Sequence, residues 1–208
     1  MTQQNILLVN SSGRFEGSVT RQLSQLIVEQ LKVGADNSNL VTRELTEGLP
    51  FINEEWIGAT FTPVENRNQA QKHVLEFSDE LVNELQLADT IVIASPIYNF
   101  SIPAVLKAWI DLTARAQLTF KYTENGPIGL IENKKIYVAI ASGGVPIGSA
   151  MDFASPYLKQ ALGFIGLTDV TIVDASSINL AGDKNEKVAK AQIAELLEPV
   201  KSGEQESN

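Results

Sequence analysis

The sequence predicts an α/β fold in which one five-stranded parallel sheet carries helices on both faces. Short runs of β-branched and other apolar residues, typical of buried strands, alternate with longer runs whose apolar residues recur at helical spacing. The chain has 208 residues, of which 44% are hydrophobic, so it is long enough to bury a substantial core. We expect a single domain over residues 1–200 and a polar, disordered tail over 201–208.

The first half of the chain predicts two strands and two helices. The apolar run at 6–10 is expected to form a buried strand, and residues 19–32 have the spacing of an amphipathic helix. The run at 40–45 is less apolar, so we expect it near the edge of the sheet. Residues 48–66 are rich in aromatic residues without regular spacing and predict a long irregular connection. A connection of this length within a compact domain more often has a function than serves as a simple linker. Residues 68–87 predict the second helix.

The second half repeats this alternation, with one excursion. The β-branched run at 89–94 predicts a central strand, and residues 103–117 predict a helix. Residues 118–131 contain an alternating run and an Asn-Gly-Pro turn signal, so they predict a hairpin outside the main sheet. The remaining strands are expected at 135–141 and 170–174, and the remaining helices at 152–165 and 185–200.

The loop after the first strand contains the elements of a phosphate site. Residues 10–20 supply several hydroxyl groups, two glycines and a helix N-terminus, whose free amides and dipole favour an anion. The loop has neither the P-loop nor the Gly-x-Gly-x-x-Gly pattern. Taken alone, an ordinary helix cap at Ser18 explains it as well as a ligand does.

Two further loops follow strands three and four. The stretch from Pro96 to Phe100 offers backbone N–H groups and a flat aromatic wall, although its aromatic residues could equally cover the sheet edge. The stretch from Ser142 to Pro146 contains adjacent glycines, which permit close approach of a ligand or a plain turn. Spacing does not fix the strand order. In the order 2-1-3-4-5, however, the loops after strands one and three flank a ligand-binding crevice, so together the three loops favour a mononucleotide site.

Composition excludes several other classes of function. The net charge of −9 argues against nucleic-acid binding, and the absence of cysteine removes disulfides, Cys-ligated zinc and iron–sulfur clusters. The single histidine, His73, falls on a predicted amphipathic helix, so we expect no metal site and no histidine-based catalysis. No apolar run is long enough to span a membrane or to act as a signal peptide, and we expect a cytoplasmic protein.

The chain resembles the FMN-dependent NADH azoreductases, relatives of the flavodoxin-like NAD(P)H:quinone oxidoreductases. The resemblance extends over nearly the whole chain and is carried by four motifs: Pro96-Ile97-Tyr98-Asn99-Phe100, Leu106-Lys107-x-Trp109-Ile110-Asp111, the run from Thr119 to Pro127, and the run from Leu162 to Val170. It implies a flavodoxin-like fold and a homodimer with one bound FMN per subunit. NADH would be the co-substrate, and small aromatic acceptors (quinones and azo compounds) would be reduced by ping-pong hydride transfer.

The resemblance also assigns residues to the flavin. Those implied to surround the phosphate and ribityl chain are Ser12, Ser18, Val19 and Thr20. Those implied to lie beside the ring are Pro96, Ile97, Tyr98, Asn99 and Phe100, with Ser142, Gly143, Gly144 and Val145 at the pyrimidine edge. Many members of the family have Ser-Arg-Gly-Gly in this last loop, whereas this chain has no arginine there, which could alter how negative charge on the reduced flavin is stabilised.

The resemblance implies that the bound FMN would carry out the redox reaction, and we expect no side chain to act as a catalytic acid or base. Backbone N–H groups near 99–100 and 143–144 are expected to polarise the flavin edges. Phe120, Tyr122 and Phe164 are expected to line the substrate slot, or to pack in the dimer. The alternatives are an electron-transfer carrier of the flavodoxin type, which lacks a substrate site, and a regulatory module that has lost its ligand.

Overall fold

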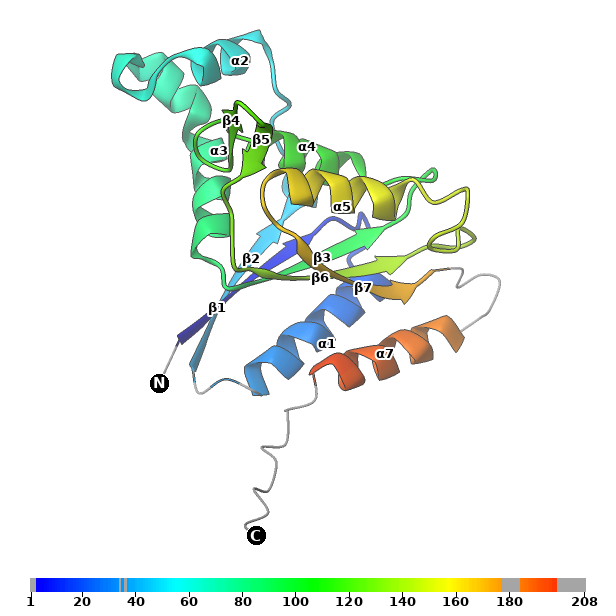
Figure 1. Ribbon diagram of the computed structural model, residues 1–208. Coiled ribbons are helices and arrows are strands. Elements are labelled where there is room, and N and C mark those ends of the chain that lie inside the picture. Colours follow the sequence, from blue (N-terminus) through cyan, green and yellow to red (C-terminus); the bar gives the residue numbers. More distant parts are fainter. Residues whose placement is uncertain (1–2, 34, 36, 177–183, 198–208) are drawn as a thin grey trace.

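The computed structural model describes residues 3–33, 35, 37–176 and 184–197. Its main sheet contains five parallel strands: β1 (Gln3–Asn10), β2 (Asn37–Glu44), β3 (Thr90–Pro96), β6 (Lys135–Ala141) and β7 (Asp169–Ala175). Their order is β2-β1-β3-β6-β7, which confirms the predicted order 2-1-3-4-5 (Figure 1). The direction of winding changes between β1 and β3, so the loops that leave these two strands border one crevice.

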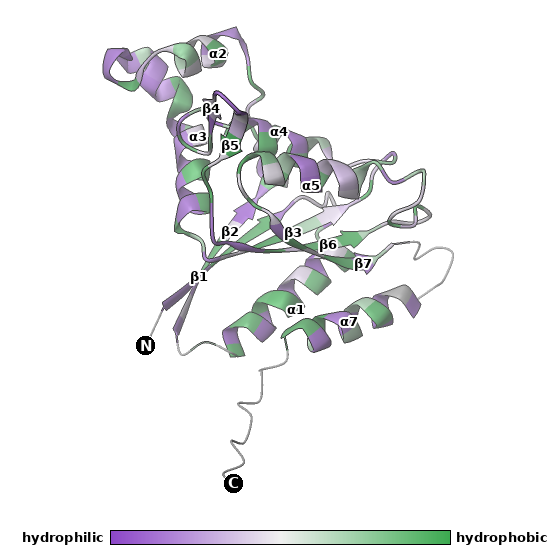
Figure 2. Cartoon of the chain, viewed as in Figure 1, coloured by the Kyte–Doolittle hydropathy of each residue, from purple (hydrophilic) through white to green (hydrophobic). Residues whose placement is uncertain are grey.

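Helices cover both faces of the sheet, as predicted. One face carries α1 (Val19–Val33) and α7 (Lys184–Leu197), and the other carries α3 (Gln69–Leu87), α4 (Ala104–Thr113) and α5 (Ala154–Phe164) (Figure 1). Hydrophobic and hydrophilic residues alternate along α1 and α7 in Figure 2, as expected of helices with one buried side. Because helices cover both faces of the sheet, the ends of its strands are the expected place for a ligand.

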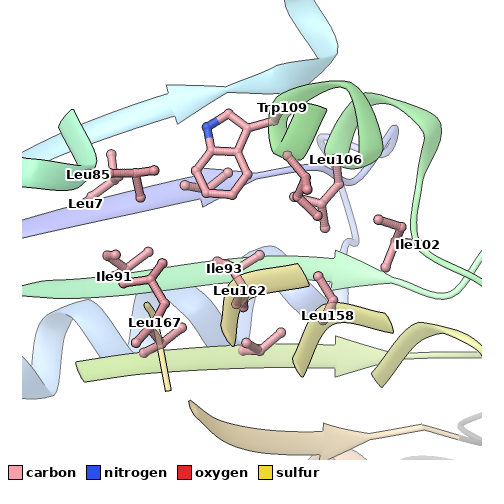
Figure 3. Close-up of a cluster of buried hydrophobic side chains, with 14 of the residues drawn as sticks. Leu7, Leu85, Ile91, Ile93, Ile102, Leu106, Trp109, Leu158, Leu162 and Leu167 are labelled. Carbon is pink, nitrogen blue, oxygen red and sulfur yellow. The ribbon is translucent and has the colours of Figure 1, made fainter. Parts of the chain in front are cut away.

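The larger of the two hydrophobic cores lies between the sheet and helices α3, α4 and α5. Trp109 of α4 is fully buried there. Leu158 and Leu162 of α5 belong to the same cluster of buried residues as Ile91 and Ile93 of β3 (Figure 3). Truncation of a buried tryptophan costs about 3–5 kcal/mol. This core holds β3 rigidly, and the turn that follows β3 begins from a fixed position.

The structure corrects the expectation that residues 48–66 are irregular. They contain the helix α2 (Glu54–Phe61), preceded by η1 (Leu45–Glu47) and followed by η2 (Val64–Asn66). Asn53 starts α2 by accepting a hydrogen bond from the backbone N–H of Trp56 at 2.8 Å. The first turn of α2 contains Glu54 and Glu55, whose negative charges are stabilised by the positive end of the helix dipole. These N-terminal signals were obscured by the irregular spacing of the aromatic residues.

Other boundaries differ from prediction by a few residues. The helix expected over 103–117 ends at Thr113, because Thr119 Oγ1 donates to the Thr113 carbonyl at 2.7 Å and accepts from the Arg115 N–H at 2.9 Å. The second strand begins at Asn37 and lies at the sheet edge, where polar residues pair readily with β1. For α7, residues 198–200 of the expected range lie outside the described residues, as does the tail over 201–208.

The predicted hairpin is confirmed. Strands β4 (Phe120–Thr123) and β5 (Gly126–Gly129) form an antiparallel pair separate from the main sheet. The hairpin packs tightly against the end of α5. A Cβ atom added to Gly129 would lie 2.1 Å from the backbone nitrogen of Gly166, so only glycine permits this approach.

Candidate functional site

A cavity of about 330 Å³ opens at the carboxyl ends of β1, β3 and β6. Three segments form it: the loop of residues 11–20 (the hydroxyl loop), the turn of residues 97–101 (the aromatic turn) and the start of the loop of residues 142–148 (the glycine loop). The lining residues are Ser12, Arg14, Gly17, Ser18, Val19, Thr20, Pro96, Ile97, Tyr98, Ala141, Ser142 and Gly143. The volume lies within the usual range for small-molecule sites.

Three buried hydroxyl groups converge in the hydroxyl loop. Ser18 Oγ donates to Ser12 Oγ at 3.0 Å and lies 3.2 Å from Thr20 Oγ1. All three side chains are at most 5% exposed. They sit at the N-terminus of α1, where Ser18 Oγ also accepts from the Arg21 N–H at 3.5 Å and the preceding amides of the first turn have no acceptor within the helix. The hydroxyls and amides together form a compact set of neutral donors backed by a helix dipole.

The aromatic turn is a left-handed two-residue turn. Tyr98 and Ser101 exchange backbone hydrogen bonds of 2.9 and 3.1 Å, and the two central residues have positive φ, 49° at Asn99 and 73° at Phe100. This is the pattern of a type I′ turn, which normally has glycine at its second central position. The carbonyl of Phe100 accepts from the Phe153 N–H at 3.0 Å, which fixes the turn against the start of α5.

Tyr98 brings the aromatic turn close to the hydroxyl loop. A Cβ atom added to Gly13 would lie 3.8 Å from Tyr98 Oη, so the phenol reaches the opposite wall of the crevice. Tyr98 is 41% exposed and lines the cavity, so its ring is accessible from solvent.

The glycine loop is closed by side-chain hydrogen bonds. Ser142 Oγ accepts from the Val145 N–H at 3.0 Å and donates to the Val145 carbonyl at 2.6 Å. The buried carboxylate of Asp152 accepts from the Gly148 N–H at 2.9 Å and from the first amides of α5. Burial opposes ionisation of Asp152, but these hydrogen bonds together hold its pKa below the usual value, so the carboxylate stays charged at neutral pH.

Most of the predicted cofactor-binding residues line the cavity. Asn99, Phe100, Gly144 and Val145 lie in the same segments but are not among its lining residues. Prediction missed three lining residues: Arg14, Gly17 and Ala141. Gly17 has φ of +64°, and a glycine at the end of a polar loop was the available signal for it. Arg14 is exposed and makes no ion pair among the described residues, so it places a positive charge at the cavity.

The three residues expected to line the substrate slot lie elsewhere in the subunit. Phe120 packs edge-on against Tyr122, with ring centroids 5.5 Å apart, and against Phe164 at 4.5 Å. Phe164 is the last residue of α5, whereas the cavity lies near the loop that leads into the first residue of that helix. This aromatic cluster is not part of the cavity within one subunit.

Other site types find no support in the part of the chain that the structure describes. No group of three His, Asp or Glu side chains there could hold a metal ion. His73 is exposed on α3 and contacts Glu76. Among the described helices, none is both long and apolar enough to cross a membrane.

Comparison with known proteins identifies the family of the chain. A family defined by a flavodoxin-like fold matches residues 4–199. The FMN-dependent NADH:quinone oxidoreductase 1 of Hahella chejuensis is 50% identical over 193 residues, which are 93% of this chain and 95% of that protein. The chain belongs to the family of FMN-dependent NADH:quinone oxidoreductases.

Solved structures similar to this family member include two from Bacillus anthracis. An azoreductase superposes with a TM-score of 0.84 at 29% identity and covers 93% of this chain and 98% of its own. An FMN-dependent NADH-azoreductase in complex with FMN superposes with a TM-score of 0.82 at 26% identity, covering 95% and 98% of the two chains.

The cavity of this family member is chemically suited to FMN. The buried hydroxyls of Ser12, Ser18 and Thr20 meet the first amides of α1, which is a donor set for a phosphate monoester. No Asp or Glu lines the cavity, and Arg14 adds a cation. Tyr98 supplies a flat wall and the aromatic turn supplies backbone amides, as a planar heterocycle requires. The residues present therefore fit the cofactor that defines the family.

Proposed function

We propose that the chain uses FMN held in this cavity to reduce quinones and azo compounds with electrons from NADH. The observation that carries the proposal is the meeting of three buried hydroxyls and a helix N-terminus with a left-handed, amide-bearing turn at the carboxyl ends of β1 and β3. A phosphate donor set and a flat wall lie side by side in one cavity, which is the arrangement that a flavin mononucleotide needs.

Each wall of the cavity has a separate role. The hydroxyl loop binds the phosphate and ribityl chain through Ser12, Ser18, Val19 and Thr20. Backbone N–H groups of the aromatic turn and the glycine loop, at Asn99, Phe100, Gly143 and Gly144, would donate to the edges of the ring, where such preorganised donors stabilise developing negative charge. When bound, FMN supplies the redox chemistry, two-electron transfer by way of hydride.

The protein contributes the position of the cofactor and its substrates, with no side chain acting as acid or base. No Asp, Glu or His lines the cavity. NADH and the acceptor use the same open side of the cavity in turn, so the reaction follows ping-pong kinetics. Quinones and azo compounds are both flat and both take up two electrons, and Tyr98 offers each the same surface.

We further propose that the protein is a homodimer in which the partner completes the substrate slot. Large apolar side chains are exposed near the cavity, including Phe100 at 52% and Phe153 at 62%. The cluster of Phe120, Tyr122 and Phe164 lies apart from the cavity of its own subunit, and Tyr122 is 71% exposed. A second copy would bring such a cluster to the open side, and light scattering of the purified protein should give the mass of two chains.

Reduction of the reconstituted protein tests the proposed function. Purified full-length chain mixed with FMN should show a flavin spectrum that bleaches under anaerobic NADH and recovers when menadione or an azo dye is added. Steady-state rates with varied NADH and menadione should give parallel double-reciprocal lines. Failure to take up FMN would refute the proposal. Rapid bleaching without turnover of either acceptor would favour the electron carrier instead.

A further inference from the structure

The side chain of Arg21 reaches back from α1 across the rear of the hydroxyl loop. Its Nη2 donates to the Ser12 carbonyl and its Nε to the Arg14 carbonyl, each at 2.8 Å. The ring of Phe15 lies 4.6 Å from its Cζ, which places an aromatic face against the guanidinium. Arg21 does not itself line the cavity, so it engages both carbonyls from outside.

Glu44 fixes this guanidinium to the sheet. Its two carboxylate oxygens accept from Nη1 and Nη2 of Arg21 at 2.6 and 2.8 Å, a bidentate pair with both side chains only 16% exposed. The same carboxylate accepts from the Thr46 hydroxyl at 2.5 Å. Burial opposes ionisation of Glu44, but the bonds from Arg21 and Thr46 lower its pKa, and the pair is charged at neutral pH.

The two carbonyl oxygens matter because Ser12 and Arg14 both line the cavity. A carbonyl oxygen directed at a phosphate would repel it, whereas an amide N–H or a hydroxyl attracts it. Bonding to Arg21 commits both carbonyls to a partner outside the cavity. The planar fork of arginine can hold two carbonyls and a carboxylate at once, which the compact ammonium of lysine cannot do in the same geometry.

We propose that Arg21, held by Glu44, is a positioning residue that makes the hydroxyl loop selective for a phosphate monoester. The inference rests on the proposed function, since the phosphate in question is that of FMN. Arg21 acts through the loop: it directs the carbonyls of Ser12 and Arg14 away from the anion and leaves the hydroxyls and amides to face it.

An ordinary structural ion pair offers the matched comparison. Arg43 of β2 is 19% exposed, pairs with Glu84 of α3 and lies over the ring of Phe77 at 5.5 Å. It thus resembles Arg21 in burial, carboxylate partner and aromatic neighbour, but it bonds no carbonyl of the cavity loops. Loss of Arg43 should reduce stability without affecting recognition of phosphate.

The test compares FMN with riboflavin, which lacks the phosphate, by fluorescence titration of the flavin-free full-length chain. In Arg21→Met and Arg21→Lys, the FMN dissociation constant should rise about tenfold or more, as for a lost charge-assisted hydrogen bond, while that of riboflavin should change less than about twofold. Arg43→Met should leave both constants unchanged. Glu44→Gln keeps Arg21 but removes its charged partner, and it should lower the preference for FMN over riboflavin. If the Arg21 variants do not fold, the result for Glu44→Gln tests the positioning role.

The possible outcomes distinguish a failure of this inference from a failure of the proposed function. If the wild-type chain binds FMN no more tightly than riboflavin, the proposed function fails. If the wild-type chain prefers FMN and the Arg21 and Glu44 variants keep that preference, the positioning role is wrong while the function stands. Equal losses for FMN and riboflavin would make Arg21 a structural residue only and would also overturn the inference.

Discussion

The hydroxyl loop and the aromatic turn line the same cavity but are held in place by different means. Side chains hold the hydroxyl loop: Ser18 joins Ser12 to Thr20, and Arg21 joins the loop to Glu44. Backbone geometry holds the aromatic turn, through the paired hydrogen bonds of Tyr98 and Ser101 and two residues in the left-handed region. The hydroxyl loop should therefore respond to the loss of individual side-chain groups, and the aromatic turn to the φ angles that a substitution allows.

The largest effect is expected at Asn99 of the aromatic turn. Proline cannot adopt the φ of 49° found there and removes the N–H donor, so Asn99→Pro should weaken FMN binding about a hundredfold. Asn99→Gly keeps both the angle and the donor and should bind FMN almost as the wild type does. Fluorescence titration measures both constants. Equal losses in the two variants would show that the asparagine side chain, and not the backbone, matters.

A smaller effect is expected in the hydroxyl loop, at Ser18. Ser18→Ala removes the hydroxyl that joins Ser12 to Thr20 and should weaken FMN binding about tenfold. Ser24→Ala is the matched control, because Ser24 is a fully buried serine of α1 whose hydroxyl donates to the Arg21 carbonyl at 3.0 Å and does not line the cavity. It should leave FMN affinity unchanged. Equal losses at Ser18 and Ser24 would point to damage to α1 and not to a phosphate contact.

The sequence predicted the parts of the molecule that depend on local pattern. The sheet and its covering helices follow from apolar periodicity, and hydroxyls at a helix start suggested the phosphate cradle. Helix α2 escaped prediction because its two signals, the Asn53 cap and the acidic first turn, begin a stretch without helical spacing. The Arg21–Glu44 pair joins residues 23 positions apart, and no local pattern indicates which carboxylate an arginine will meet.

The handedness of the aromatic turn was also beyond sequence reasoning. Asn-Gly is the usual signal for a type I′ turn, and this chain has phenylalanine at the glycine position. The angle at Phe100 is imposed by its surroundings, including the bond from the Phe153 N–H to its carbonyl. Left-handed backbone at a residue of this kind costs about 1 kcal/mol or more, and such strain persists only where the surrounding structure enforces it.

The smallest expected effect tests that strain directly, by comparing Phe100→Gly with Phe100→Ala. Both variants remove the ring, so their difference reports the backbone alone. At an ordinary loop position, glycine is less stable than alanine by about 0.4–1 kcal/mol, because it leaves more freedom to the unfolded chain. At φ of 73° the order should reverse, with Phe100→Gly more stable by about 1 kcal/mol in urea denaturation. If alanine proved the more stable, the turn would not be left-handed at this residue, and the contrast between a side-chain-held loop and a backbone-held turn would fail.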